Sequence, residues 1–189
     1  DASLTSMRGS IVYDKDAPFP HKELFKLNKP ILGVCYGMQV LTHMLGGSVE
    51  KSKTREFGRA ELFVDSNKDL FSNLPTNLTC WMSHGDSIQK MPQGFIKIAH
   101  TLNAPVAAFA NRTKKIFGVQ FHPEVAHTQR GTQVIQNFLS SICGCLPRWT
   151  MDKFIQAGIK QIKEAVGNKK VVLGLSGGVD SAVTAMLIQ

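Results

Sequence analysis

The clearest apolar pattern in the first part of the chain is a short continuous run followed by helical spacing. Residues 30–34 read Pro-Ile-Leu-Gly-Val, a run typical of a strand buried inside a parallel sheet. Apolar side chains then recur every three or four positions over residues 38–45, and Gly46-Gly47 follows as a helix stop. The pattern predicts a strand, a sharp turn and a helix.

Between residues 49 and 125 the pattern changes to short strand-like segments separated by turn-forming residues. Strands are expected over residues 60–64, 78–82, 95–100, 106–110 and 116–121. A helix is predicted over residues 130–142, because its apolar side chains fall on one face. Gly144, Leu146 and Pro147 then interrupt the pattern, so a domain boundary is expected near Trp149.

Beyond this boundary the pattern predicts an amphipathic helix from Thr150 to Gly167 and a buried strand over residues 171–175. A further strand, turn and helix are expected over residues 176–189. The chain begins without Met and stops inside a run of helix formers, so we expect a piece of a longer protein. Residues 1–10 are excluded from the fold prediction. The result is an α/β protein with one domain over residues 1–149 and the start of another over 150–189.

Composition narrows the class of protein. The apolar share of 43% in 189 residues suits a globular core, and the 19% of charged residues excludes heavily charged disorder. There is no apolar run of about 18 residues and no secretory signal pattern, so a soluble, cytosolic protein is expected. The net charge of +8 raises the question of a polyanion ligand. Like charges are not grouped in long runs, which favours a solvated surface and leaves a small phosphate ligand open.

Candidate chemistry begins at Cys35, where the apolar run ends and the predicted helix begins. The surrounding sequence is Gly-Val-Cys-Tyr-Gly-Met-Gln, with Gly33 and Gly37 relieving the crowding of a tight turn. A helix N-terminus favours thiolate over thiol, and the amide of Tyr36 could receive an oxyanion. The alternative is an apolar cysteine in a core strand. Cys80, Cys143 and Cys145 have no spacing that fits zinc and are expected to be free thiols.

A second motif, Gly-Val-Gln-Phe-His-Pro-Glu-Val, favours the catalytic alternative. His122 follows another apolar strand, and Glu124 lies two residues later. A nucleophilic thiol needs a base, and that base needs a carboxylate to orient its ring. Since the ends of neighbouring parallel strands meet at one sheet edge, Cys35, His122 and Glu124 are expected to lie together.

These motifs, together with Trp-Met-Ser-His-Gly-Asp at residues 81–86, resemble the class I glutamine amidotransferases in order and spacing. The resemblance implies a flavodoxin-like α/β fold, a mostly parallel sheet with helices on both faces. It implies Cys35 as nucleophile, His122 as base and acid, and Glu124 as the residue that orients His122. It also implies that glutamine and its oxyanion are bound by Gly33, Tyr36, Gln39, Ser83, His84, Gly85 and Asp86. By itself, the segment 83–86 is typical of a polar turn.

A second glycine-rich loop, Ser-Gly-Gly-Val-Asp-Ser, lies at residues 176–181 between a predicted strand and helix. Its backbone amides and hydroxyls, with a helix dipole behind them, favour phosphate or pyrophosphate. It lacks the Gly-Lys-Ser/Thr ending of a Walker A loop. Asp180 fits two roles equally, a ligand of Mg²⁺ or a cap of the following helix.

This loop resembles the pyrophosphate-binding motif of the ATP pyrophosphatases. The resemblance implies that ATP is bound by the residues of this chain that match the motif: Ser176, Gly177, Gly178, Val179, Asp180, Ser181 and Ala182. An amidotransferase domain followed directly by such a loop is similar to the glutamine-hydrolysing GMP synthase family, as are residues 55–62 and 127–131. The resemblance implies a ligase that uses glutamine, Mg-ATP and xanthosine 5′-phosphate (XMP), with no nucleic acid or membrane partner, as a homodimer. Met7 to Ser10 depart from it, because the family has a Gly-Gly-Pro segment there, and the first strand of the domain is expected to be missing.

Two alternatives stay open on the sequence. One keeps the fold and changes the chemistry, as a cysteine hydrolase of another amide or an amidotransferase serving a different synthetase. The other is a nucleotide-binding or polyanion-binding module in which Cys35 is structural. Replacement of Cys35 by Ala tests the binding module against the enzymes, because glutamine hydrolysis that survives the replacement would favour the module.

Overall fold

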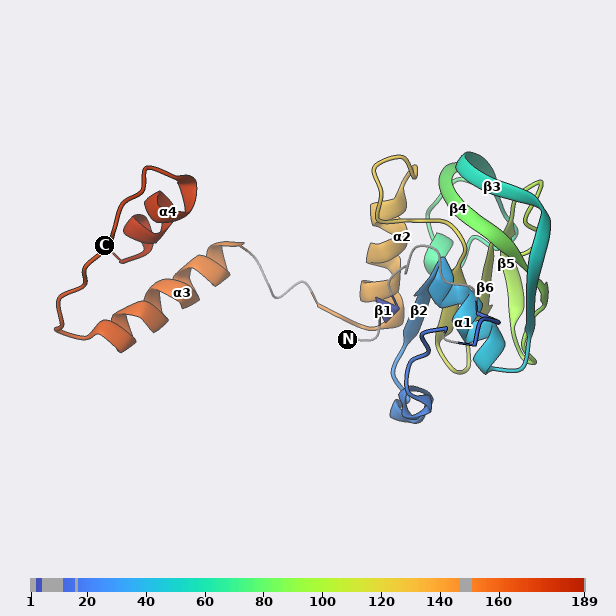
Figure 1. Cartoon of the computed structure of the whole chain (residues 1–189), viewed down its shortest axis with the longest axis horizontal. Helices are drawn as coiled ribbons and strands as arrows, with labels where there is room; N and C mark the ends of the chain where they lie inside the picture. Colours follow the sequence, from blue (N-terminus) through green and yellow to red (C-terminus); the bar gives the residue numbers. More distant parts are fainter. Residues whose placement is uncertain (1–2, 5–11, 16, 147–150, 189) are drawn as a thin grey trace. The chain divides into compact units, whose positions relative to one another are not determined.

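The computed structural model describes residues 3–4, 12–15, 17–146 and 151–188 (Figure 1). The chain divides into two compact units, Asp1–Cys145 and Leu146–Gln189. The boundary predicted at Trp149 and the Met7 to Ser10 segment lie outside the described residues. The two units are described separately below.

The first unit is built on a 7-stranded sheet with the order β1-β2-β7-β6-β5-β3-β4. The strands are β1 (Ser3–Leu4), β2 (Ile31–Val34), β3 (Ser48–Val64), β4 (Asn77–Lys90), β5 (Ile96–His100), β6 (Ala108–Asn111) and β7 (Ile116–Val119). The short strands lie close to the predicted ranges. The strands β3 and β4 extend well beyond them, because their antiparallel pairing continues into polar positions that carry no alternating apolar signal.

Strand direction divides the sheet into two parts. Parallel pairs join β1 to β2 and β2 to β7, whereas antiparallel pairs join β7 to β6, β6 to β5, β5 to β3 and β3 to β4. The expectation of parallel pairing is therefore right for the strands that precede Cys35 and His122. The rest of the sheet corrects it, because short connections such as residues 112–115 between β6 and β7 allow only hairpins.

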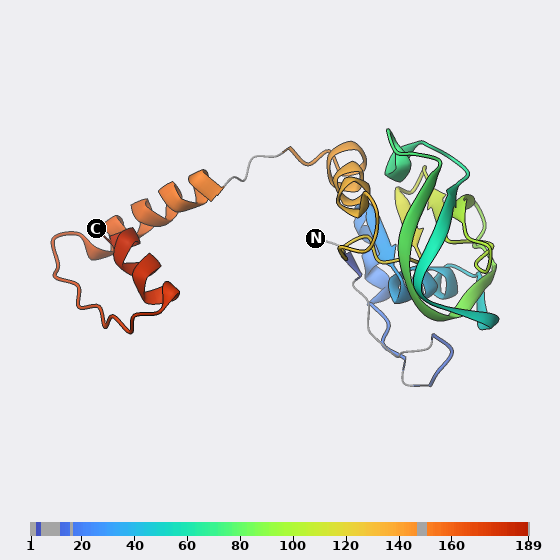
Figure 2. The ribbon, with the colours of Figure 1, turned by 90° about the horizontal axis from the view of Figure 1, so that it is seen from above.

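Helices cover both faces of the parallel strands, as expected for an α/β protein. Helix α1 (Tyr36–Met44) packs with Ile31 in one buried cluster, whereas helix α2 (Gly131–Asn137) and the following π-helical turn (Phe138–Ile142) pack with Leu32 in another. Successive side chains of a strand point to opposite faces, so β2 contributes to both clusters. Figure 2 shows α1 and α2 on either side of β2.

The amino-terminal segment corrects one prediction. The predicted fold excludes residues 1–10 and lacks the first strand of the domain. Ser3 and Leu4 nevertheless form β1, in parallel register with Leu32 and Gly33 of β2. A strand of two residues is too short to give an alternating sequence pattern, so only the pairing identifies it.

The second unit contains helices α3 (Met151–Val166) and α4 (Val179–Ile188). Helix α3 agrees with the amphipathic pattern. The strands expected over residues 171–175 and after Ser176 are wrong for this structure, because residues 171–178 form no strand. Val172 is 98% exposed. An apolar run becomes a strand only where another strand pairs with it, and the described residues of this unit offer none.

In the parts of the chain that the structure describes, no helix combines the length and the apolar character needed to span a membrane.

Candidate active site

Cys35 occupies the turn between β2 and α1. Its backbone has φ 53° and ψ −108°, and a positive φ is rare for residues other than glycine. Its N–H donates to the Val119 carbonyl at 2.8 Å, which ties the turn to the end of β7. A side chain at Gly33 would lie 2.6 Å from Cδ1 of Leu41 and 2.7 Å from the Gly37 backbone. Gly33 therefore lets α1 pack closely on β2, and this packing supports the turn.

The Cys35 thiol is buried at the edge of an apolar cluster and is contacted by two polar groups. Its Sγ donates to the Ser83 carbonyl at 3.7 Å and accepts from Nε2 of Gln120 at 3.8 Å. Burial raises the pKa of the thiol to about 11, although the Tyr36 backbone N–H lowers it and the Glu124 charge raises it further. The amide at the start of the helix thus favours the thiolate, as expected, but desolvation outweighs this hydrogen bond and the net effect favours the thiol. The thiol needs a base to become a nucleophile.

His122 and Glu124 supply such a base. Nδ1 of His122 donates to Oε1 of Glu124 at 2.7 Å, which leaves Nε2 as the free ring nitrogen. The His122 side chain is 10% exposed and that of Glu124 is 44% exposed. The Glu124 charge also raises the pKa of Cys35, so Glu124 lies near enough to the thiol to act on it through space. The arrangement can transfer a proton from the thiol to a ring whose cationic form a carboxylate stabilises.

The backbone of His122 is held by a separate set of hydrogen bonds. Its N–H donates to the Trp81 carbonyl at 3.0 Å, and Oγ1 of Thr128 donates to its carbonyl at 2.5 Å. Oγ1 of Thr128 also accepts from the Trp81 N–H at 3.1 Å. The rings of His127 and Trp81 contact each other in a tilted arrangement, with centroids 4.7 Å apart and planes 33° from parallel. Thr128 therefore connects the His122 loop to β4, a role that the sequence did not indicate.

Gln39 and Gln120 form a buried amide pair beside Cys35. Nε2 of Gln39 donates to Oε1 of Gln120 at 3.3 Å, and Gln120 donates in turn to the Cys35 sulfur. Gln39 is thus linked to the thiol through Gln120, and its role in binding glutamine stays a prediction. Gln120 was missed, although it lies two residues before His122 in the same motif. A buried glutamine among apolar neighbours was the available signal, since such amides need partners.

The segment Ser83 to Asp86 lies inside β4 and not in a turn. The Ser83 carbonyl reaches Cys35, whereas the His84 side chain is buried with Glu56 and bonds to its Oε2 at 3.2 Å. Oδ1 of Asp86 accepts from the Tyr13 hydroxyl at 2.9 Å. Gly85 lies next to Arg55. The structure brings Ser83 to the thiol and gives the other three residues different partners.

The glycine-rich loop of the second unit is exposed. The Ser176 hydroxyl donates to that of Ser181 at 3.2 Å and accepts from the Gly178 N–H at 3.4 Å. Helix α4 begins at Val179, so Asp180 lies in its first turn. The described residues contain no cluster of three or more metal-binding side chains. The carboxylate of Asp180 and the neighbouring hydroxyls are oxygen donors of the kind Mg²⁺ takes when phosphates complete its shell.

Comparison with known families agrees with the division of the chain into two units. Residues 13–142 match the family model of class-I glutamine amidotransferases, and residues 151–189 match the NAD synthase model. The first match contains Cys35, His122 and Glu124, and the second contains the loop at residues 176–181.

Individual relatives are similar along nearly the whole chain. The glutamine-hydrolysing GMP synthase of Acetivibrio thermocellus is 51% identical over 94% of this chain and 35% of its own length. That of Brachyspira hyodysenteriae is 50% identical over 100% of this chain and 37% of its own. This chain therefore spans about a third of the length of these relatives.

A solved structure agrees with the fold. A Thermoplasma acidophilum protein described as a GMP synthase subunit superposes with a TM-score of 0.63 at 36% identity, covering 72% of this chain and 65% of that one. The family match over residues 13–142 contains the turn that carries Cys35. The chain therefore belongs to the class-I glutamine amidotransferase family, with glutamine-hydrolysing GMP synthases among its curated relatives.

Proposed function

We propose that this chain carries the glutamine-hydrolysing site of a GMP synthase, with Cys35, His122 and Glu124 as its catalytic residues. The observation that supports the proposal is a buried thiol in a strand-to-helix turn, which feels the charge of the same carboxylate that holds Nδ1 of His122. The carboxamide of glutamine is the substrate that the family match supports.

The first half of the proposed reaction is an attack on glutamine. His122 takes the Cys35 proton at Nε2, and the sulfur adds to the carboxamide carbon. The carbonyl oxygen becomes an oxyanion, which the Tyr36 N–H at the start of α1 would stabilise, because helix N-terminal amides lack partners within the helix. His122 returns the proton to the amide nitrogen, so ammonia leaves and a thioester remains on Cys35.

The second half is the hydrolysis of the thioester. Water loses a proton to His122 while its oxygen adds to the thioester carbon, and the sulfur leaves as the carbon–oxygen bond forms. Glutamate is released, and Cys35 recovers its proton. In this scheme Gln39 and the Ser83 to Asp86 segment bind glutamine; the Ser83 carbonyl contacts the thiol, and Gln39 is linked to it through Gln120.

We further propose that the second unit begins an ATP pyrophosphatase domain, with a boundary near residue 150. The loop Ser176 to Ala182 would hold the phosphates of ATP, and Asp180 would hold Mg²⁺, which neutralises phosphate charge when bound. The complete protein would adenylate XMP, and ammonia from the glutamine site would displace AMP to give GMP. The match of residues 151–189 supports the nucleotide chemistry, and the GMP synthase relatives support XMP as acceptor. The family resemblance supports a homodimer.

The experiment measures two activities of the complete protein. Glutamate release from glutamine tests the first unit, and AMP release from ATP with and without XMP tests the acceptor. We expect Cys35→Ala to abolish glutamate release and to leave GMP formation from added ammonium salt. AMP release that XMP fails to stimulate would reject GMP synthase in favour of another synthetase.

A further inference from the structure

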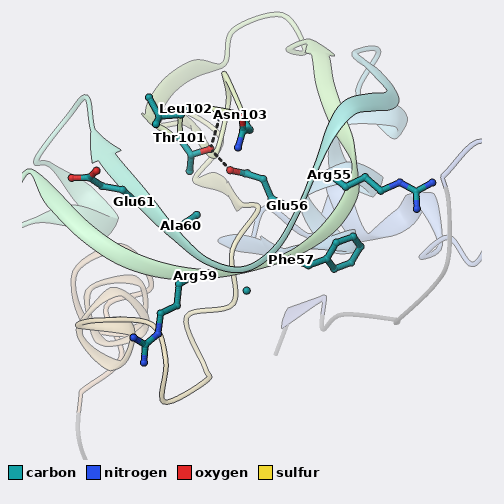
Figure 3. A pocket seen from close by; sticks show the side chains of 10 residues that line it. Arg55, Glu56, Phe57, Arg59, Ala60, Glu61, Thr101, Leu102 and Asn103 are labelled. Carbon is teal, nitrogen blue, oxygen red and sulfur yellow. Dashed lines mark hydrogen bonds between the residues drawn. The ribbon is translucent and has the colours of Figure 1, made fainter.

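The strand segment Arg55–Glu61 lines a hollow of about 250 Å³ together with residues 101–103 (Figure 3). Alternate side chains of the strand point outward, so Phe57 and Glu61 are exposed. Glu56 points inward and is only 7% exposed. A carboxylate so deeply buried is costly unless hydrogen bonds and a positive charge compensate for the lost water, so its partners define its role.

The partners of Glu56 come from two other segments. Oγ1 of Thr101 donates to Oε1 at 2.9 Å, and Nε2 of His84 contacts Oε2 at 3.2 Å. Burial by itself raises the pKa of Glu56, but the hydrogen bonds from His84 and Thr101 outweigh it and lower the pKa overall. Glu56 is therefore ionised at neutral pH.

His84 is fully occupied by this network. Its Nδ1 lies 2.8 Å from the Asp86 carbonyl oxygen, and its Nε2 faces the ionised Glu56. Both ring nitrogens of His84 therefore have a partner inside the protein. Neither nitrogen remains to bind a substrate.

The position of this pair in the sheet connects it to Cys35. The ladder between β3 and β4 is irregular between Lys51 and Glu56, and it resumes with Glu56 opposite His84. The next pair is Phe57 with Ser83, whose carbonyl accepts from the Cys35 sulfur. The Glu56–His84 pair thus sets the register at the point where β4 reaches the nucleophile, and a slip by one residue would turn the strand over.

We propose that Glu56 is a positioning residue of the glutamine site, acting through His84 to hold the Ser83 carbonyl against Cys35. The inference rests on the proposed glutaminase function and assigns His84 to this pair in place of substrate contact. Loss of the Glu56 charge would loosen the backbone beside the thiol and leave glutamine affinity largely unchanged.

The test compares Glu56→Gln, His84→Gln and the double variant in the complete protein, with Glu61→Gln as control. Gln keeps the size of Glu56, and Glu61 is an exposed glutamate on the same strand that lines the same hollow. We expect kcat for glutamate release to fall between about tenfold and 100-fold in each single variant, with KM within threefold, since small misplacements of catalytic groups act on kcat. The double variant should lose no more than the worse single variant, because the residues act as a unit.

A second measurement separates this inference from the proposed function. Alkylation of Cys35 by iodoacetamide needs no glutamine hydrolysis, and we expect its rate at fixed pH to change at least threefold in Glu56→Gln and not in Glu61→Gln. If the unaltered protein hydrolyses no glutamine but Glu56→Gln still changes the alkylation rate, the proposed function is rejected and the positioning role is kept. The positioning role would be overturned by a folded Glu56→Gln variant with unchanged alkylation rate and unchanged kcat. A raised KM with unchanged kcat in His84→Gln would overturn it as well.

Stability could limit these variants, because a buried polar or charged group that loses its hydrogen-bond partner is costly. Thr101→Val then takes the place of Glu56→Gln, since it removes one donor to Glu56 and leaves Glu56 and His84 themselves in place. A fall in kcat with constant KM supports the role, and wild-type kinetics with wild-type alkylation contradict it.

Discussion

Oε1 of Glu124 lies 2.7 Å from Nδ1 of His122, although only Pro123 separates the two residues. The fixed φ of proline and its restriction on the preceding residue turn the chain so that both side chains meet. The backbone of His122 is held independently by Trp81 and Thr128. Orientation of the ring and position of the loop are therefore controlled by different residues, which can be varied separately.

Glu124→Gln should lower kcat for glutamate release by roughly 10²- to 10⁴-fold, the range in which the loss of a base-orienting carboxylate acts. The amide keeps the size of the side chain but cannot stabilise the imidazolium. KM should change little, since Glu124 orients the base and binds no substrate in this account. Steady-state kinetics check this, with the exposed Glu61→Gln as control. A loss below threefold would remove Glu124 from the mechanism.

Replacing Thr128 by Val should lower kcat about tenfold and the free energy of unfolding by roughly 1–3 kcal/mol, the cost of leaving buried polar groups unsatisfied. The methyl group keeps the volume but gives up the bonds to the His122 carbonyl and the Trp81 N–H. Kinetics and urea unfolding measure the two effects. Thr113→Val, at an exposed threonine, is the matched control and should change neither. Equal behaviour of the two variants would contradict the role of Thr128.

The reactivity of Cys35 should depend steeply on pH in the absence of glutamine. Burial raises the pKa of the thiol to about 11, so about one thiol in a thousand is ionised at pH 8. The rate of alkylation by iodoacetamide should therefore rise about tenfold per pH unit between pH 7 and 9.5 without levelling. Free cysteine, with a pKa of about 8.5, levels within this range and serves as the reference. A plateau below pH 9 would show that desolvation does not dominate.

Gly33→Ala should destabilise the first unit by about 1–3 kcal/mol through overpacking. Its new methyl group would lie 2.7 Å from the Gly37 backbone, which cannot move without displacing α1 and the Cys35 turn. Gly158 in α3 has no atom within 4 Å of an added Cβ, so Gly158→Ala should be neutral or stabilising. Urea unfolding of both variants decides this. If Gly33→Ala keeps wild-type stability, the close packing of α1 on β2 is not required.

Much of the fold could be predicted because apolar patterning and turn chemistry are local. The run at residues 30–34, the glycines after α1 and the amphipathic α3 all give their element directly. The run at residues 171–175 has the same apolar character as β2 but forms no strand, because β2 pairs with β1 and β7 whereas the described second unit provides no partner. Pairing is a property of the neighbours and not of the run itself.

The catalytic candidates could be found from the sequence because Cys35, His122 and Glu124 lie in short motifs with an evident chemical logic. Their supporting residues could not. Glu56 is a charged residue in a polar segment, and its burial depends on His84 and on Thr101, 45 residues away. The raised pKa of Cys35 likewise depends on the depth of burial, which no local pattern reports.

The central claim is that Cys35 is the nucleophile toward glutamine, and site mapping tests it most directly. The complete protein is incubated with a glutamine analogue that carries a chloromethyl ketone, and the adduct is located by mass spectrometry. Cys80, Cys143 and Cys145 are the internal controls, since all three are free thiols in the same chain. The account predicts one adduct, on Cys35, that excess glutamine prevents and His122→Ala strongly slows. An adduct on another cysteine, or labelling of Cys35 that glutamine does not affect, would contradict it.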